Sequence, residues 1–447
     1  MSTIRISRGS VAVEWPDEPL RTKLCYWRGN RYEQLYVDNA RRHTLVTLPG
    51  FAERVESLCD DPVVVDERVP MPEPDLGAAS EGLEGPLAGP VAEAIRNGGG
   101  RISFPSVLGS AQVVAAILRA YPRDRLAERG TPLSIVAAQN TREAWRLGKR
   151  IRRLLPGREL STMKGDSDDI IVTTYAMLPE MPRHLAGVFI GEDVSSQDLL
   201  QRIEAVSGIR NAARWGICPT PPGGEPEPDL AAEGLFGPKS ASCTYAEAVA
   251  AGIAVPVRVC WVPSPRPNAP LGSAGFRLLE AIATQENAAF VETVADIAAR
   301  VPDRLGCLVH AGTPAMATRV ARLAPDIGTV CKRAGKAKRN ELLDGIADGS
   351  VRRAIVTGDY IPRELCQDVV VAATCLGREF PGRLFPWRRR RRDGDMAYVV
   401  DFTHAWDVHN GRPGVLALND EARRRRYREM GFGQIEVDGV DGLPFLG

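Results

Sequence analysis

The stretch of sequence that decides the fold is residues 98–118, GGGRISFPSVLGSAQVVAAIL. It has the layout of a phosphate-binding loop, with glycines, a short apolar strand at Ile102–Phe104, a turn of small residues and a buried helix. A working loop reads GxxxxGK[ST]: its lysine neutralises the outer phosphates, its hydroxyl holds magnesium, and its backbone N–H groups surround the phosphates. Gly109 stands at the second glycine, but Ser110 occupies the lysine position and Ala111 the hydroxyl position. The loop keeps its outline and lacks the two side chains that carry out its chemistry.

Composition limits the classes of protein to which the chain can belong. Its 447 residues are enough for two or three domains, and a net charge of +1 excludes a globally basic nucleic-acid binder. No apolar run approaches the roughly 20 residues that span a bilayer, and the first residues lack the apolar core of a signal peptide. Nine cysteines are scattered without a CxxC pair, which argues against a zinc ribbon or a disulfide framework. We therefore expect a cytoplasmic protein with no membrane contact.

The pattern along the chain predicts an α/β protein in three parts. Residues 1–69 indicate a small α/β domain, and the proline-rich residues 70–82 indicate a linker. Residues 83–229 and 276–447 each alternate short apolar strands with helices, which is typical of a parallel sheet covered on both faces. Residues 230–275 are expected to connect these two lobes. The predicted strands of the lobes are 102–104, 133–137, 170–174, 187–190, 215–218, 307–310, 354–357, 369–372 and 397–401.

Beyond the loop, a series of segments occurs in the order found in superfamily-2 DNA helicases. The chain resembles the phage UvsW-like and restriction-type group, whose members have two RecA-like lobes behind a small DNA-recognition domain. The segments that carry the resemblance are 41–45 with 63–68, 98–111 (motif I), 135–143 (motif Ia), 168–175, 188–194 (motif II), 215–221 (motif III), 233–238 with 245–256, 354–359 (motif V) and 382–384 (motif VI). The resemblance implies tandem RecA-like lobes as the fold.

The departures from the family pattern fall on the residues that turn over ATP. Besides Ser110 and Ala111 in motif I, Gly191 stands where motif II has its magnesium-holding aspartate. Glu192 keeps the position of the catalytic base, and Arg383 that of the arginine finger, so both are vestigial on this interpretation, like the loop residues Ser106, Gly109, Ser110 and Ala111. Phosphoryl transfer depends on positioning and charge neutralisation, so the losses predict no hydrolysis and no cofactor. ATP and magnesium are expected only if the motifs are divergent but active.

Nucleic-acid contacts are predicted at two kinds of position. The resemblance places backbone contacts at Thr141 and Arg142 of motif Ia and at the strand end formed by Thr173 and Thr174. Runs of arginine repel one another unless an anion lies nearby, and phosphate is the obvious anion. The predicted arginine contacts are Arg388, Arg389, Arg390, Arg391, Arg392, Arg423 and Arg424. The alternative for each run is a solvated charged surface. His404 and His409 with Asp401 and Asp407 fit no zinc spacing, so no metal is predicted.

The sequence thus favours a pseudohelicase: a non-hydrolysing, helicase-like subunit that binds duplex or branched DNA, a protein partner, or both, in a phage or mobile-element DNA transaction. Two alternatives stay open. One is an active DNA-dependent ATPase with divergent motifs, and the other is a protein-binding scaffold that touches no nucleic acid. A nucleotide sensor that binds without hydrolysis is disfavoured by the missing lysine.

Overall fold

The structure of the protein is a computed structural model that describes residues 2–28, 31–83, 85–105, 109–164, 166–167, 169–192, 203–218, 226–268, 275–330, 336–357, 367–374 and 395–446. It divides into two compact units, Met1–Cys243 and Thr244–Gly447. Ser106, Arg383 and the Arg388–Arg392 run lie outside the described residues. None of the helices among the described residues combines the length and the apolar character that a bilayer crossing requires.

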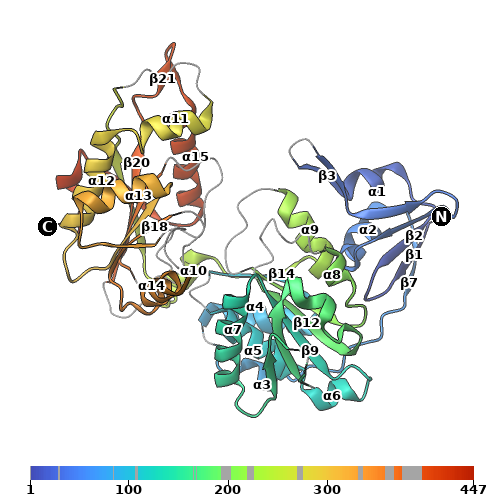
Figure 1. The fold of residues 1–447 in the computed structure, drawn as a ribbon. Coiled ribbons are helices and arrows are strands. Elements are labelled where there is room, and N and C mark those ends of the chain that lie inside the picture. The colour runs from blue at the N-terminus through green and yellow to red at the C-terminus, as the bar shows by residue number, and fades with distance from the viewer. Residues whose placement is uncertain are drawn as a thin grey trace. The chain divides into compact units, whose positions relative to one another are not determined.

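The first unit begins with a small mixed sheet, drawn in blue in Figure 1. Alternating residues of β1 and β2, such as Ile4 and Val13, are buried against Phe51 and Val55 of the helical segment that follows β6. The strand order is β5-β6-β2-β1-β7, with β1 and β7 parallel and the other pairs antiparallel. The elements are β1 (Thr3–Ile6), β2 (Val11–Glu14), α1 (Glu18–Lys23), the hairpin β3 (Cys25–Arg28) and β4 (Arg31–Gln34), β5 (Tyr36–Asn39), β6 (Thr44–Thr47), α2 (Ala52–Leu58) and β7 (Val63–Asp66).

A seven-stranded parallel sheet forms the rest of the first unit, in the order β10-β11-β9-β12-β13-β8-β14. Because successive strand residues face opposite sides, Val136 of β9 packs on one face of the sheet and Ile135 on the other. The strands are β8 (Gly100–Ser103), β9 (Leu133–Ala138), β10 (Leu160–Thr162), β11 (Ile170–Thr174), β12 (Ala186–Glu192), β13 (Ala213–Cys218) and β14 (Lys239–Ser242). The core of one face includes α3 (Leu76–Ser80), α4 (Ala88–Arg96), α5 (Ser110–Ala120), α6 (Arg123–Ala127) and α7 (Thr141–Leu154), and that of the other includes η4 (Tyr175–Glu180), α8 (Ile203–Ser207) and α9 (Pro226–Phe236).

The second unit repeats this architecture with the order β17-β18-β16-β19-β20-β15-β23, again all parallel. Its strands are β15 (Val257–Pro263), β16 (Cys307–Ala311), β17 (Gly328–Val330), β18 (Arg353–Thr357), β19 (Val369–Ala373), β20 (Ala397–Thr403) and β23 (Gly433–Glu436), with a short hairpin of β21 (Val408–His409) and β22 (Arg412–Pro413). Its helices are α10 (Tyr245–Ala250), α11 (Phe276–Ala283), α12 (Ala288–Arg300), α13 (Pro314–Leu323), α14 (Lys336–Asp348) and α15 (Val415–Glu429). The predicted fold class, two tandem RecA-like lobes behind a small α/β domain, is confirmed.

Two predicted boundaries differ from the structure. The predicted linker contains α3, whose N-cap Asp75 accepts a hydrogen bond from the backbone N–H of Ala78 and whose Ala79 is buried in the first lobe. The predicted connection 230–275 is divided between the lobes. β14 pairs with β8 in the first sheet, and β15 pairs with β20 in the second. α3 and β14 are short elements that are stabilised by the neighbours on which they pack, and the predicted connection also takes in β15, a strand of the second sheet.

Candidate functional site: the carboxyl edge of the first sheet

The candidate site lies where the parallel strands of the first sheet end. Because the strands run in one direction, their carboxyl ends meet at one edge, where open α/β sheets bind ligands. In the register of the sheet, Thr174 of β11 lies beside Ala138 of β9, and Gly191 of β12 lies beside Gly216 of β13. The segments predicted as motifs I, Ia, II and III therefore end or begin at this edge.

The described residues around the predicted phosphate loop differ from the GxxxxGK[ST] pattern at several positions. Gly109 has a φ of 86° and forms the N-cap of α5, so the positive φ explains its glycine. Phe104, five residues earlier, stands where GxxxxGK has its first glycine, and it is buried. Ala111 is also buried, and the side-chain amide of Gln112 lies against Gly109, within 3.0 Å of the place that a Cβ would take. Ser110 stands at the position predicted for the lysine.

The glycine run before the loop lies at the opposite edge of the sheet. Gly98, Gly99 and Gly100 precede or begin β8, so they lie at its amino end, away from Gly109. A Cβ on Gly99 would come within 3.0 Å of the carbonyl oxygen of Arg214, and one on Gly100 within 3.0 Å of Ser240. The expectation that these glycines belong to the phosphate loop is corrected: they permit close packing between strands.

Gly191, which stands in the segment predicted as motif II, has no room for a side chain. A Cβ on Gly191 would lie within 3.0 Å of both Phe236 Cζ and Tyr175 Oη, and one on Gly216 within 3.0 Å of Phe236 Cγ. The Phe236 ring also stacks on Phe189, with 5.7 Å between ring centroids. An aromatic ring from the end of α9 therefore fills the space into which a carboxylate at position 191 would project.

Glu192, predicted at the position of the catalytic base, is buried. The residue ends β12 and is 5% exposed. Its backbone carbonyl accepts a hydrogen bond from the Tyr175 hydroxyl at 3.2 Å. Asp193 lies outside the described residues.

The residues of the first lobe that are predicted to contact the nucleic-acid backbone fall into two groups. Thr141 is exposed at the start of α7, where Asn140 caps the helix by accepting a hydrogen bond from Glu143 N at 3.0 Å, and Arg142 is half-buried beside it. Thr173 and Thr174 are both buried within β11, between β9 and β10. The expectation that their hydroxyls contact phosphate is corrected, because the neighbouring strands and helices cover them.

Arg423 is likewise a structural residue in the second lobe. Its guanidinium is 1% exposed, lies 3.0 Å from Asp401 Oδ2 and 2.9 Å from Asp420 Oδ1, and is surrounded by further hydrogen bonds that join Asp401 to Tyr427 and Asp420 to His404. Burial alone would lower the pKa of Arg423, but the charges of Asp401 and Asp420 raise it above its ordinary value. The predicted phosphate contact of Arg423 is corrected, since α15 turns this residue toward the sheet.

Arg424, the next residue, is partly covered as well. Its guanidinium lies 4.3 Å from the centre of the Trp261 ring and forms an ion pair with Glu436. The side chain is 19% exposed. Arg424 therefore presents a small part of its charge to solvent.

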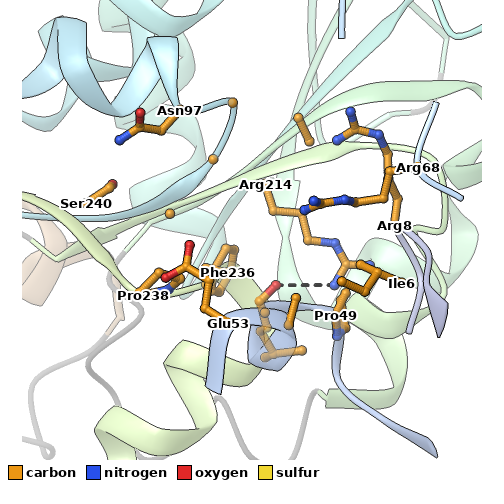
Figure 2. Close-up of a pocket in the computed structure, with 18 of the residues that line it drawn as sticks. Ile6, Arg8, Pro49, Glu53, Arg68, Asn97, Arg214, Phe236, Pro238 and Ser240 are labelled. Atoms are coloured by element: carbon orange, nitrogen blue, oxygen red, sulfur yellow. Dashed lines mark hydrogen bonds between the residues drawn. The ribbon is translucent and has the colours of Figure 1, made fainter. Parts of the chain in front are cut away.

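Sequence reasoning missed a pocket at the opposite, amino edge of the first sheet, between this sheet and the small N-terminal domain. The cavity measures about 490 Å³, and Arg8, Arg68 and Arg214 gather on one side of it (Figure 2). Its signal in the sequence is Arg214, a charged residue inside the apolar strand that runs from Ala213 to Cys218.

Solved structures with a similar arrangement of elements were compared with the chain. No protein-family model and no curated protein sequence matches it. A fragment of a putative HsdR subunit of a type I restriction enzyme from Vibrio vulnificus aligns with 79% of the chain and 68% of its own, at 14% identity and a TM-score of 0.55. The DUF1998 helicase MrfA bound to DNA aligns over 85% and 57%, at 12% identity and a TM-score of 0.54. Dbp5 of S. cerevisiae, bound to RNA and ADP BeF3, aligns over 77% and 88%, at 10% identity and a TM-score of 0.52.

The chain has the fold of a superfamily-2 helicase. At these identities the likeness concerns the fold alone.

Proposed function

We propose that this helicase-like protein is catalytically degenerate and acts as a non-hydrolysing subunit that binds DNA, a protein partner, or both, in a phage or mobile-element DNA transaction. The observation that carries the proposal is the packing at Gly191. The motif II carboxylate is missing, and Phe236 and Tyr175 occupy its space. Magnesium would lose its protein ligand, and the outer phosphates would lose the lysine, so the charge neutralisation on which phosphoryl transfer depends is absent.

Nucleic-acid binding is supported by three further observations. MrfA and Dbp5, which share the fold, are helicases or helicase-fold proteins solved with DNA and with RNA. Thr141 is exposed at the carboxyl edge of the first sheet, with Arg142 half-buried beside it. The Arg388–Arg392 run adds five consecutive guanidiniums that phosphate could neutralise. Such contacts position a protein on nucleic acid without reading its sequence.

The direct test is equilibrium binding of the purified protein to duplex, forked and single-stranded DNA across a salt series, with and without ATP and magnesium. We expect salt-steep binding that ATP does not change, and a shallower slope when Arg388–Arg392 are all replaced by Gln, because each lost phosphate contact removes about 0.9 from the slope. The matched control replaces Arg425, which is exposed on α15, by Gln. Salt-insensitive binding to protein alone would favour the scaffold, and DNA-stimulated hydrolysis would favour an active ATPase.

A gain-of-function experiment tests the degeneracy itself. The double substitution Ser110→Lys and Ala111→Thr supplies the two missing side chains of motif I, and we expect it to produce no robust ATPase, because Gly191 still lacks a carboxylate. Hydrolysis is measured as phosphate release with and without DNA. Strong turnover by this variant would show that motif II still functions and would overturn the proposal.

A further inference from the structure

The pocket at the amino edge of the first sheet is built by two parts of the first unit that are held together tightly. A Cβ on Gly50 would come within 3.0 Å of backbone atoms of Glu233, Gly234 and Gly237, so the N-terminal domain and the end of α9 meet backbone to backbone. Arg54 of α2 donates two hydrogen bonds to the Glu233 carboxylate, at 2.6 and 2.7 Å. These contacts hold the two walls of the pocket against each other.

Arg214 contributes a buried positive charge to this pocket. It belongs to β13, is 6% exposed, and donates hydrogen bonds to the backbone carbonyls of Leu235, at 3.2 Å, and Ile209. Among the described residues no carboxylate forms an ion pair with it, and its Nε has no hydrogen-bond partner. Burial, and then the charge of Arg8, lower the pKa of Arg214 to about 10, so it is still charged at neutral pH. A buried charge without a counter-ion is costly, and buried charges in proteins are usually paired.

Arg8 and Arg68 bring two more guanidiniums to the same side of the pocket (Figure 2). Arg8 donates two hydrogen bonds to the Val69 carbonyl, at 3.0 and 2.8 Å, and has no carboxylate partner among the described residues. Burial, and then the charge of Arg68, lower the pKa of Arg8. Arg68 pairs with Asp66 and is exposed at the rim. Among these three guanidiniums only Arg68 forms an ion pair in the described residues, with Asp66, and the charge of Glu53 also acts on it. The remaining positive charge favours an added anion.

The rest of the pocket is mainly acidic and polar, with Lys239 as one further cation. Glu53 and Glu56 of α2 and Glu93 of α4 line it, all three exposed, together with the polar side chains of Asn97 and Ser240. A nucleic-acid strand that passed through the pocket would bring its charged phosphates close to these three carboxylates. A small ligand with its anionic group at one end avoids that repulsion, and the remaining carboxylates can accept hydrogen bonds from its hydroxyl or amino groups.

We propose that this pocket binds a small phosphomonoester, with the phosphate on Arg8 and Arg68, the buried charge of Arg214 supporting it, and hydroxyl or amino groups facing Glu53 and Glu93. A cavity of about 490 Å³ lies in the range of small-molecule sites. Arginine is suited to phosphate because its planar donors bind two oxygens at once. The site is separate from the carboxyl edge and does not depend on the absence of ATP turnover there.

The test is isothermal titration of the full chain with ribose 5-phosphate, with inorganic phosphate, and with ribose as the phosphate-free probe, at constant ionic strength. We expect ribose 5-phosphate to bind, inorganic phosphate to bind more weakly, and ribose not to bind. Arg8→Gln and Arg68→Gln should each weaken ribose 5-phosphate about tenfold or more, because each removes a charge-assisted hydrogen bond. Arg42→Gln, an exposed arginine of the same domain outside the pocket, should leave the affinity within about twofold.

Several results would overturn the proposal. These are no binding of ribose 5-phosphate to the unaltered protein, equal binding by Arg8→Gln, Arg68→Gln and Arg42→Gln, or displacement of the bound phosphomonoester by a short DNA strand, which would assign the pocket to nucleic acid. Arg214→Met is expected to weaken binding too, and because that variant can also lose stability, the Arg8 and Arg68 variants carry the decision. DNA affinity and ATP turnover of the Arg8→Gln variant report on the proposed function separately, and both should match those of the unaltered protein.

Discussion

At the scale of single residues, Gly191 decides what the carboxyl edge can accommodate. We expect Gly191→Ala to lower the free energy of unfolding by about 1–3 kcal/mol, because its methyl group would overlap Phe236 and Tyr175. Urea unfolding monitored by circular dichroism measures the change. Gly157→Ala is the matched control, since Gly157 lies in an exposed turn with nothing within 4 Å of a Cβ. If the overlap is the cause, Phe236→Leu should lower the free energy of unfolding less in the Gly191→Ala variant than in the unaltered protein. Additive losses from the two substitutions would contradict this explanation.

In the second lobe, the residue with the largest expected effect is Arg423, which forms buried ion pairs with Asp401 and Asp420. Arg423→Met leaves Asp401 and Asp420 buried without their cation, and breaking a buried ion pair costs about 3–5 kcal/mol. We expect a fall of that size in the free energy of unfolding, measured with urea, and little change for Arg425→Met on the exposed side of α15. If folded Arg423→Met lost DNA affinity without losing stability, that result would support the original prediction that Arg423 contacts phosphate.

At the scale of elements, α9 joins the N-terminal domain to the first sheet. We expect Arg54→Ala to loosen this docking. The substitution removes both hydrogen bonds to the Glu233 carboxylate, which is only 13% exposed in the unaltered protein. Hydrogen exchange should rise in α2 and at the end of α9, and protease should cut more readily between β7 and α3. The control is Arg21→Ala, which breaks an ion pair with Asp38 inside the N-terminal domain and should change exchange only there. Unchanged exchange in Arg54→Ala would show that the Gly50 contact suffices.

The elements also show how far the sequence predicts this fold. β11 was predicted at Ile170–Thr174, its observed bounds, because a short, wholly buried apolar run has few alternatives. β14, Lys-Ser-Ala-Ser, carries no such signal, since an edge strand is defined by its one neighbour, β8. The missing motif residues are visible in the sequence. That Phe236, 45 positions after Gly191, fills the gap depends on tertiary packing, which local patterns do not encode.

At the scale of the whole molecule, the two units have separate cores, and buried thiols can report on each of them. Burial raises the pKa of Cys260 and of Cys307 to about 12 in the second unit, so neither thiol should react with iodoacetamide in the folded state at pH 8. Half-buried Cys25 and Cys59 should react first. Along a urea series, mass spectrometry of labelled peptides should show Cys218 in the first unit and Cys260 in the second becoming reactive at different midpoints. A single shared midpoint would indicate one cooperative unit.

The same thiols predict a loss of stability in alkali. Their pKa is about 12 in the folded protein and about 8.5 in an unfolded chain, so the folded state holds these protons more tightly. The contribution of these thiols to the free energy of unfolding is complete below about pH 8.5 and is lost as the pH rises toward 12. Cys307→Ser lacks a thiol that titrates in this window, so the free energy of unfolding of this variant should depend less on pH between 8.5 and 10.5. An unchanged slope in urea unfolding would contradict this origin.

The ring of Phe236 has a consequence for how such a protein can change over generations. A lineage that regained an acidic residue at position 191 would first meet two aromatic side chains in its way, and moving one of them would disturb the end of α9 against which the N-terminal domain is docked. Each single step back would therefore produce a less stable chain, and proteins close to their stability threshold lose such variants to selection. On the proposed function, few substitutions are needed to lose ATP turnover. Because of the Phe236 ring, regaining it requires several residues to change together.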